Sequence, residues 1–202
     1  MQNLRNLAWR LSWYRQSELE GALLLGRMVR QASDPYLIAR LTRHCADEAR
    51  HAWLWERTLA RLDLVAVRIF RSYQSLYLDH AGAPASLEDV LAMTHVFEHR
   101  VHHRFAEELR QPGLPEPARR TFSTLLRDER GHLDWVGKWL GARPSAASAL
   151  RRYRDADERV YRQLAPFGER VWDIPGLGEE LTGERHDDRT EEPHEAESEH
   201  RS

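Results

Sequence analysis

Two short motifs in the sequence place a carboxylate and an imidazole at the same spacing. Asp47-Glu48-Ala49-Arg50-His51 is followed, at an offset of 81 residues, by Asp128-Glu129-Arg130-Gly131-His132. In each motif the glutamate and the histidine are three residues apart, so they share one face if the segment is helical. A further glutamate precedes each motif: Glu18 lies 30 residues before Glu48, and Glu98 lies 31 residues before Glu129. Mixed carboxylate and imidazole ligands suit iron or manganese, so these residues are candidate ligands for a pair of metal ions.

Four helices that each offer one carboxylate, two of them with a histidine as well, form the ligand pattern of the di-iron and di-manganese carboxylate bundles. The chain therefore resembles the ferritin-like superfamily, and in particular its oxidase and hydroxylase branch with paired D-E-x-x-H motifs. The resemblance implies two iron (or iron and manganese) ions per chain as the cofactor. It implies six ligands: Glu18, Glu48, His51, Glu98, Glu129 and His132.

The aspartate that precedes each motif glutamate has an implied role as well. In the oxygen-activating branch, this aspartate hydrogen-bonds the histidine of the opposite motif. By resemblance, Asp47 would orient His132 and Asp128 would orient His51, which would fix the tautomer of each ring. This feature favours the oxygen-activating members over the storage ferritins.

The elements that must position these residues are helices. Apolar residues at steps of three and four predict five of them, at residues 4–32, 35–62, 86–110, 116–140 and 145–165. Residues 64–85 show no clear period and are expected to be a long crossover that makes the second and third helices parallel. The predicted fold is all-α: a ferritin-like four-helix bundle with this crossover between helices 2 and 3, plus a fifth, C-terminal helix.

The domain boundaries follow from composition. Residues 1–165 are expected to form the bundle, residues 166–178 an ordered arm, and residues 179–202 a disordered tail rich in acidic residues and histidine. The formal net charge of −2 disfavours a DNA-binding surface. The single cysteine, Cys45, leaves no disulfide framework and no thiolate metal site. No apolar run reaches the ~18 residues of a membrane span, and the expected location is the cytoplasm.

Several other residues near the motifs are weaker candidates for pocket or redox roles. Tyr14 lies one turn before Glu18, and Trp55 stands where radical-generating relatives have a tyrosine, so the resemblance excludes a stable tyrosyl radical there. Thr94, His95 and His102 flank Glu98, although partly exposed polar side chains explain the two histidines equally well. On the first helix Glu20 competes with Glu18, but its half-polar neighbours place it at the periphery.

The resemblance implies an oxidase or hydroxylase that activates dioxygen to oxidise an unidentified substrate, with a reductase as partner and a homodimer as a possible assembly. One alternative is a ferroxidase or peroxide-detoxifying protein in the manner of ferritins and rubrerythrins. A second alternative is a metal-free helical interaction module. That module would carry the four glutamates on solvent faces, or paired with arginines such as Arg50 and Arg130.

Overall fold

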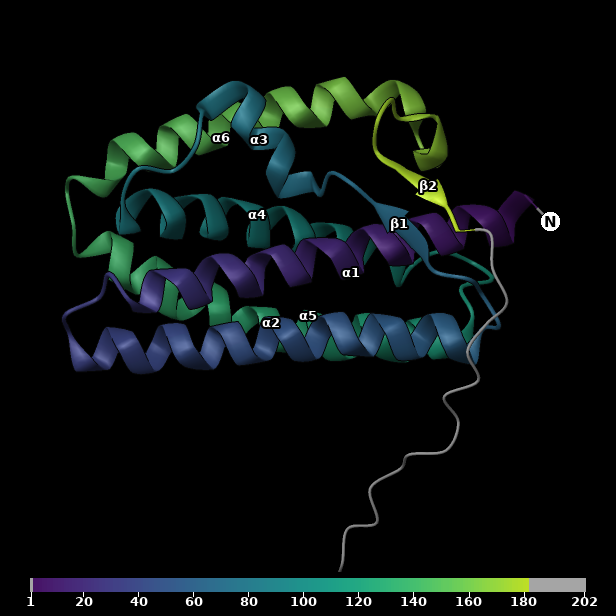
Figure 1. The fold of residues 1–202 in the computed structure, drawn as a ribbon, viewed down its shortest axis with the longest axis horizontal. Coiled ribbons are helices and arrows are strands. Elements are labelled where there is room, and N and C mark those ends of the chain that lie inside the picture. The colour runs from purple at the N-terminus through teal and green to yellow at the C-terminus, as the bar shows by residue number, and fades with distance from the viewer. Residues whose placement is uncertain (1, 182–202) are drawn as a thin grey trace, which may run out of the picture.

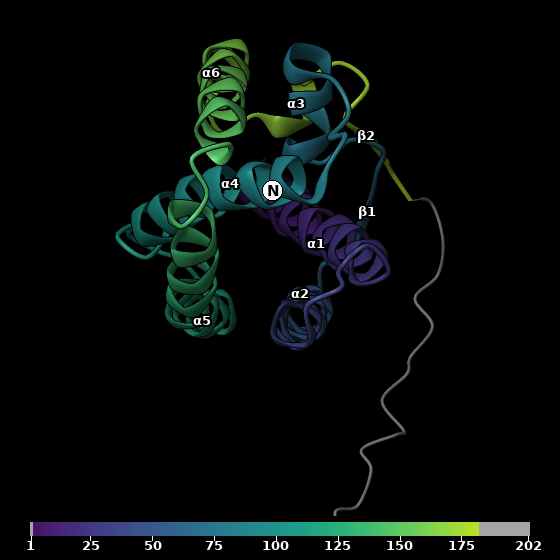
Figure 2. The ribbon, with the colours of Figure 1, turned by 90° about the vertical axis from the view of Figure 1, so that its left-hand side faces the viewer.

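The computed structural model describes residues 2–181, and most of this range is helical. The four long helices α1 (Gln2–Val29), α2 (Pro35–Arg61), α4 (Leu87–Glu108) and α5 (Glu116–Gly141) lie lengthwise beside one another (Figure 1). Seen end-on, they surround a common centre, with α3 (Tyr73–Ala81) and α6 (Ala146–Leu164) on one side (Figure 2). The described chain is thus all-α in class, with two short strands added.

Local sequence signals explain where these helices begin. The carboxylate of Asp34 accepts a hydrogen bond from the Tyr36 backbone N–H at 3.1 Å, and Pro35 occupies the first turn of α2. Ser86 caps α4 through the Asp89 N–H at 3.0 Å. With Glu88 and Asp89 in its first turn, α4 also has negative charge where the helix dipole favours it.

The segment between α2 and α4 carries the chain back along the bundle. It contains the strand β1 (Val67–Ile69) and the helix α3, so it has more regular structure than its sequence pattern indicates. Because the segment returns to the starting end, α2 and α4 run in the same direction, while α1 and α5 run opposite to them (Figure 1). The pairs α1–α2 and α4–α5 therefore present their motifs to the same interior.

The C-terminal part of the described chain packs against the outside of the four helices. Helix α6 contacts α3 and α4, and two short 3-10 turns at Ala165–Phe167 and Val171–Asp173 follow it. The strand β2 (Gly178–Glu180) then pairs antiparallel with β1, with Val67 opposite Glu180. A small apolar cluster holds this arm in place: Trp9, Val67, Ile69, Val171, Ile174 and Leu177.

The strand β2 differs from the expectation that disorder starts at residue 179. Backbone pairing with β1 orders Glu179 and Glu180, and the Glu180 carboxylate also accepts hydrogen bonds from Arg5 and Trp9 at 2.5 and 2.9 Å. Composition could not reveal a partner strand more than 100 residues away. The rest of the predicted tail, residues 182–202, lies outside the described residues. No helix between residues 2 and 181 is long and apolar enough to cross a membrane.

Candidate metal centre

The six predicted ligands converge in the middle of the bundle. Helix α1 contributes Glu18 and α4 contributes Glu98, while α2 and α5 each contribute the glutamate and histidine of one motif. A seventh residue, His44 of α2, joins them. All seven side chains are buried, with at most 4% of any residue exposed. Such a concentration of buried carboxylates is costly unless positive charge balances it.

The seven residues form two overlapping groups, and within each group the potential ligand atoms lie within 4.8 Å of one another. One group consists of Glu18, Glu48, His51 and Glu129, and the other consists of His44, Glu48, Glu98 and His132. Glu48 belongs to both groups. Because a carboxylate has two oxygens, Glu48 could serve both groups at once.

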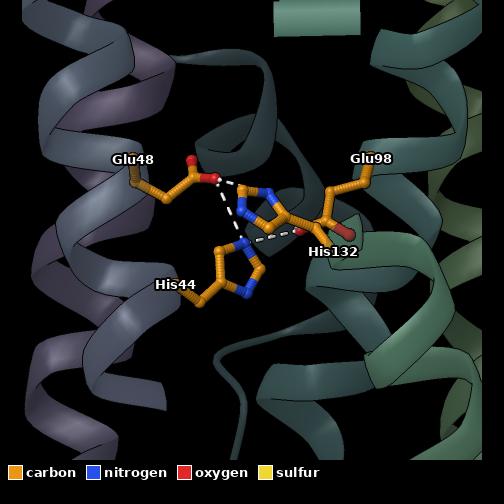
Figure 3. Close-up of side chains that lie close together, drawn as sticks. All are labelled: His44, Glu48, Glu98 and His132. Carbon is orange, nitrogen blue, oxygen red and sulfur yellow. Dashed lines mark hydrogen bonds and ion pairs between the residues drawn. The ribbon is translucent and has the colours of Figure 1, made fainter. Parts of the chain in front are cut away.

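Figure 3 shows the second group in detail. Nε2 of His44 lies 3.1 Å from a carboxylate oxygen of Glu48 and 2.9 Å from one of Glu98. Nδ1 of His132 lies 3.3 Å from the same Glu48 oxygen. Two ring nitrogens and two carboxylates from three helices thus point at one small volume, a donor set that could hold a divalent ion.

His44 was missed in the sequence, although a signal for it exists. It precedes Glu48 by four residues and His51 by seven, so all three residues lie on one helical face. The internal repeat conceals it, because the offset of 81 residues pairs His44 with Leu125. The neighbouring Cys45 faces α1, where its Sγ lies 3.2 Å from the carbonyl oxygen of Ala22.

The two motif histidines have the same orientation. Nδ1 of each ring faces the buried carboxylates, and Nε2 faces an aspartate of the opposite motif. Asp47 lies 3.4 Å from Nε2 of His132, and Asp128 lies 3.5 Å from Nε2 of His51. This is the cross-pairing that the resemblance implied. An aspartate at Nε2 favours a proton on that nitrogen and leaves Nδ1 as a lone-pair donor.

Burial, mutual repulsion and contacts with histidines shift the pKa values of the four glutamates in different directions. Burial, together with the charges of Glu48 and Glu129, raises the pKa of Glu18 well above its ordinary value. Burial also raises the pKa of Glu98. Burial acts in the same direction on Glu48 and Glu129, but contacts with histidines outweigh it and hold both pKa values below the ordinary value.

Two of the histidines have raised pKa values because they lie beside the carboxylates. Burial disfavours a proton on His44, but the charge of Glu98 and the hydrogen bond to Glu48 raise its pKa to about 9. For His132, contacts with Glu129 and Glu48 outweigh burial and raise the pKa to about 12. Without cations, protons on these rings offset the carboxylates. The rings of His44 and His132 are tilted by 32° with centroids 3.7 Å apart, so positive charges on both rings would repel each other.

Several buried side-chain atoms of the two groups have no well-directed hydrogen bond, which leaves them free to bind a cation. Neither carboxylate oxygen of Glu98 has a well-directed hydrogen bond, and neither does Nδ1 of His51. Buried polar atoms are rarely left in this state, and they are the atoms that would bind cations. Gly21 keeps space free at this point, because a Cβ there would lie 2.9 Å from a Glu48 oxygen.

The remaining predicted residues lie at various distances from these groups. Trp55 donates a hydrogen bond to Glu18 at 3.4 Å, and Thr94 is buried one turn before Glu98 on α4. Tyr14 contacts the Trp55 ring, but its hydroxyl donates to Glu108 at 3.2 Å.

Three polar side chains near the motifs belong to neither ligand group. His95 packs against Gly137 and His99, and His102 is likewise outside both groups. Glu20 accepts hydrogen bonds from Ser72 and Gln16, so it faces the crossover. The structure therefore brings Glu18, and not Glu20, to the buried centre.

The comparison with known proteins adds no family assignment. Neither a scan against models of protein families nor a search of curated proteins finds a match to this chain. The site is thus defined by its geometry, in which four carboxylates and three imidazoles from four helices surround one buried volume.

Proposed function

We propose that the protein is a di-metal oxidoreductase of the ferritin-like type that activates dioxygen to oxidise or hydroxylate an organic substrate. Two iron (or iron and manganese) ions would be held by the two overlapping ligand groups, with Glu48 shared between them. The observation that carries the proposal is the convergence of four buried glutamates with no arginine or lysine partner among the described residues. Four carboxylates balance two divalent ions, and neutral imidazoles complete the ligand set.

When bound, a redox-active metal pair supplies the electrons that reduce dioxygen. The residues of this chain bind and orient. Asp47 and Asp128 hold the imidazoles of His132 and His51 with Nδ1 inward. Trp55 donates to Glu18 and fixes that carboxylate. The rings of Trp55, Tyr14 and Phe122 pack together on this side of the centre and exclude water.

A cavity beside α1 and α4 supports a substrate of modest size. It has a volume of about 350 Å³, and apolar surface predominates in its lining. Tyr14, Ser17, Phe97 and Val101 are among its walls, and Ser17 and Phe97 are the chain neighbours of Glu18 and Glu98. This volume falls within the range of small-molecule sites.

Burial counts against the metal-free interaction module. That alternative required the four glutamates on solvent faces or paired with arginines such as Arg50 and Arg130. Arg50 instead binds Asp128 at 2.8 Å, and Arg130 is exposed.

Metal analysis of the purified protein tests the proposal. After anaerobic loading with ferrous iron and removal of free metal, we expect about two metal ions per chain. Glu48→Ala and Glu129→Ala should lose most of this metal, and Glu20→Ala should retain it. Oxygen uptake by the loaded protein, with a reductant present, then distinguishes repeated turnover from a single round of iron oxidation. A wild-type protein that stays metal-free, or equal metal loss from Glu20→Ala, would contradict the proposal.

A further inference from the structure

A cleft between α2 and α5 reaches the centre from its histidine side. It has a volume of about 320 Å³, and His44 and His132 form part of its wall. Because both histidines also belong to the second ligand group, the cleft borders the centre. It lies on other helices than the apolar cavity, which is lined by α1, α3, α4, α6 and the segment after α6.

The lining of the cleft carries an excess of positive charge. Four arginines contribute to it, against two aspartates. The aspartates are already engaged: Asp128 lies 2.8 Å from Arg50 and Asp47 lies 3.9 Å from Arg43. The arginines of this cleft would repel a cation and attract an anion.

Arg40 is the arginine whose charge is least satisfied. Within residues 2–181 it forms no ion pair with a carboxylate, and its Nε is buried without a hydrogen bond. Its guanidinium lies over the Trp135 ring, 5.4 Å from the ring centroid, and Trp135 also lines the cleft. A guanidinium held in place by an aromatic ring is preorganised to bind an oxyanion.

We propose that this cleft is a binding site for a small oxyanion, the carboxylate or phosphate group of a compact ligand, with Arg40 as its main contact. The space beside Gly131 in this cleft is open, since a Cβ built there would meet no atom within 4 Å. The oxyanion would be held beside His44 and His132 without replacing them as metal ligands. Oxyanion binding at Arg40 is separate from the proposed oxidase activity and is tested separately.

Isothermal titration of the full-length protein with inorganic phosphate, succinate and neutral succinamide tests the site and identifies the oxyanion. We expect saturable binding of phosphate or succinate, and none of succinamide. Arg40→Gln should weaken binding by about tenfold or more, as expected for loss of a charge-assisted hydrogen bond. The matched control is Arg57→Gln, because Arg57 is an exposed arginine farther along α2 and does not line the cleft.

A second pair of variants keeps the test independent of Arg40. Gly131→Glu places a carboxylate in open space within the cleft and should abolish binding, while the neutral Gly131→Gln, of equal size, should weaken it less. Metal content is measured for every variant, so a failure of metal binding is seen separately from a failure of oxyanion binding. The proposal is overturned by an absence of saturable binding, by equal effects of Arg40→Gln and Arg57→Gln, or by equal effects of the two Gly131 variants.

Discussion

His44 makes the two ligand groups unequal. The group that contains His132 has two imidazoles and two carboxylates, whereas the group that contains His51 has one imidazole and three carboxylates. The internal repeat alone would give both groups the same donors. His44 breaks this symmetry, because the residue 81 positions later is Leu125. The two metal positions should therefore differ in charge and in affinity.

This asymmetry gives a prediction for His44→Gln. The group around His132 loses one of its two nitrogen donors, while the group around His51 keeps all of its own. We expect affinity for one of the two metal ions to fall by at least about tenfold, and the other ion to remain bound. Stepwise metal titration followed by elemental analysis measures this, with His102→Gln as the control. Equal loss of both ions would show that His44 does not serve one metal position alone.

The ligands that could be predicted from the sequence are those that occur in both halves of the internal repeat. Glu48 and Glu129, and His51 and His132, could be found because each has a counterpart at an offset of 81 residues. His44 has none, because the same offset leads from His44 to Leu125. The arginines of the cleft were unremarkable in a sequence rich in arginine. Their convergence depends on how α2 and α5 pack, which no local pattern specifies.

Among the elements, α3, α4 and α6 are tied together by one carboxylate. Asp157 of α6 is 7% exposed, and it receives hydrogen bonds from Tyr73 and Tyr77 of α3 at 3.2 and 2.6 Å. Arg100 of α4 binds the same carboxylate through Nε and Nη2. The crossover helix and the C-terminal helix are thus both anchored to α4, two residues after Glu98.

Asp157→Ala should therefore destabilise the fold. It leaves Tyr77 and Arg100 without their shared acceptor, and removal of one partner of a buried charged pair costs about 3 kcal/mol. Urea unfolding measures the change. Asp155→Ala is the control on the same helix: Asp155 is exposed and lies outside this network, so about 0.5 kcal/mol or less is expected. A loss for Asp157→Ala no larger than the control's would mean that α6 is held by its apolar face alone.

The long helices could be predicted because their signals are local. Asp34 with Pro35, and Ser86 with its acidic first turn, mark helix starts within a few residues of the structure's boundaries. The strand pair β1–β2 could not be predicted in the same way. It forms between three-residue segments far apart in the chain, and one of these lies in a segment whose composition suggests disorder.

At the scale of the whole molecule, the proposed metal centre lowers the stability of the chain when no metal ion is bound. Apolar residues fill the bundle above and below it, but the centre itself holds four carboxylates. Burial and the charges of Glu48 and Glu129 raise the pKa of Glu18, so its ionised form is disfavoured in the metal-free fold. Cations that remove this repulsion stabilise the folded state by mass action.

Glu18→Gln should consequently have opposite effects in the two states. In the metal-free protein the substitution removes the charge that the neighbouring carboxylates repel. The side-chain carbonyl oxygen of the glutamine can still accept the hydrogen bond from Trp55. We expect it to raise the free energy of unfolding by about 1–3 kcal/mol at pH 7.5. Because the folded-state pKa of Glu18 is raised, the wild type loses stability relative to the variant as pH rises above the ordinary range of glutamate. The gain should therefore shrink at pH 5.

Thermal unfolding with and without ferrous iron measures both effects in one experiment. Iron should raise the midpoint of the wild type markedly and that of Glu18→Gln much less, because the variant has lost an anionic ligand. Glu20→Gln is the control: Glu20 binds Ser72 and Gln16 and belongs to neither ligand group, so neither effect is expected. If Glu18→Gln destabilised the metal-free protein, Glu18 would not be under repulsion there. Metal binding would then have to derive its stabilisation from the imidazoles.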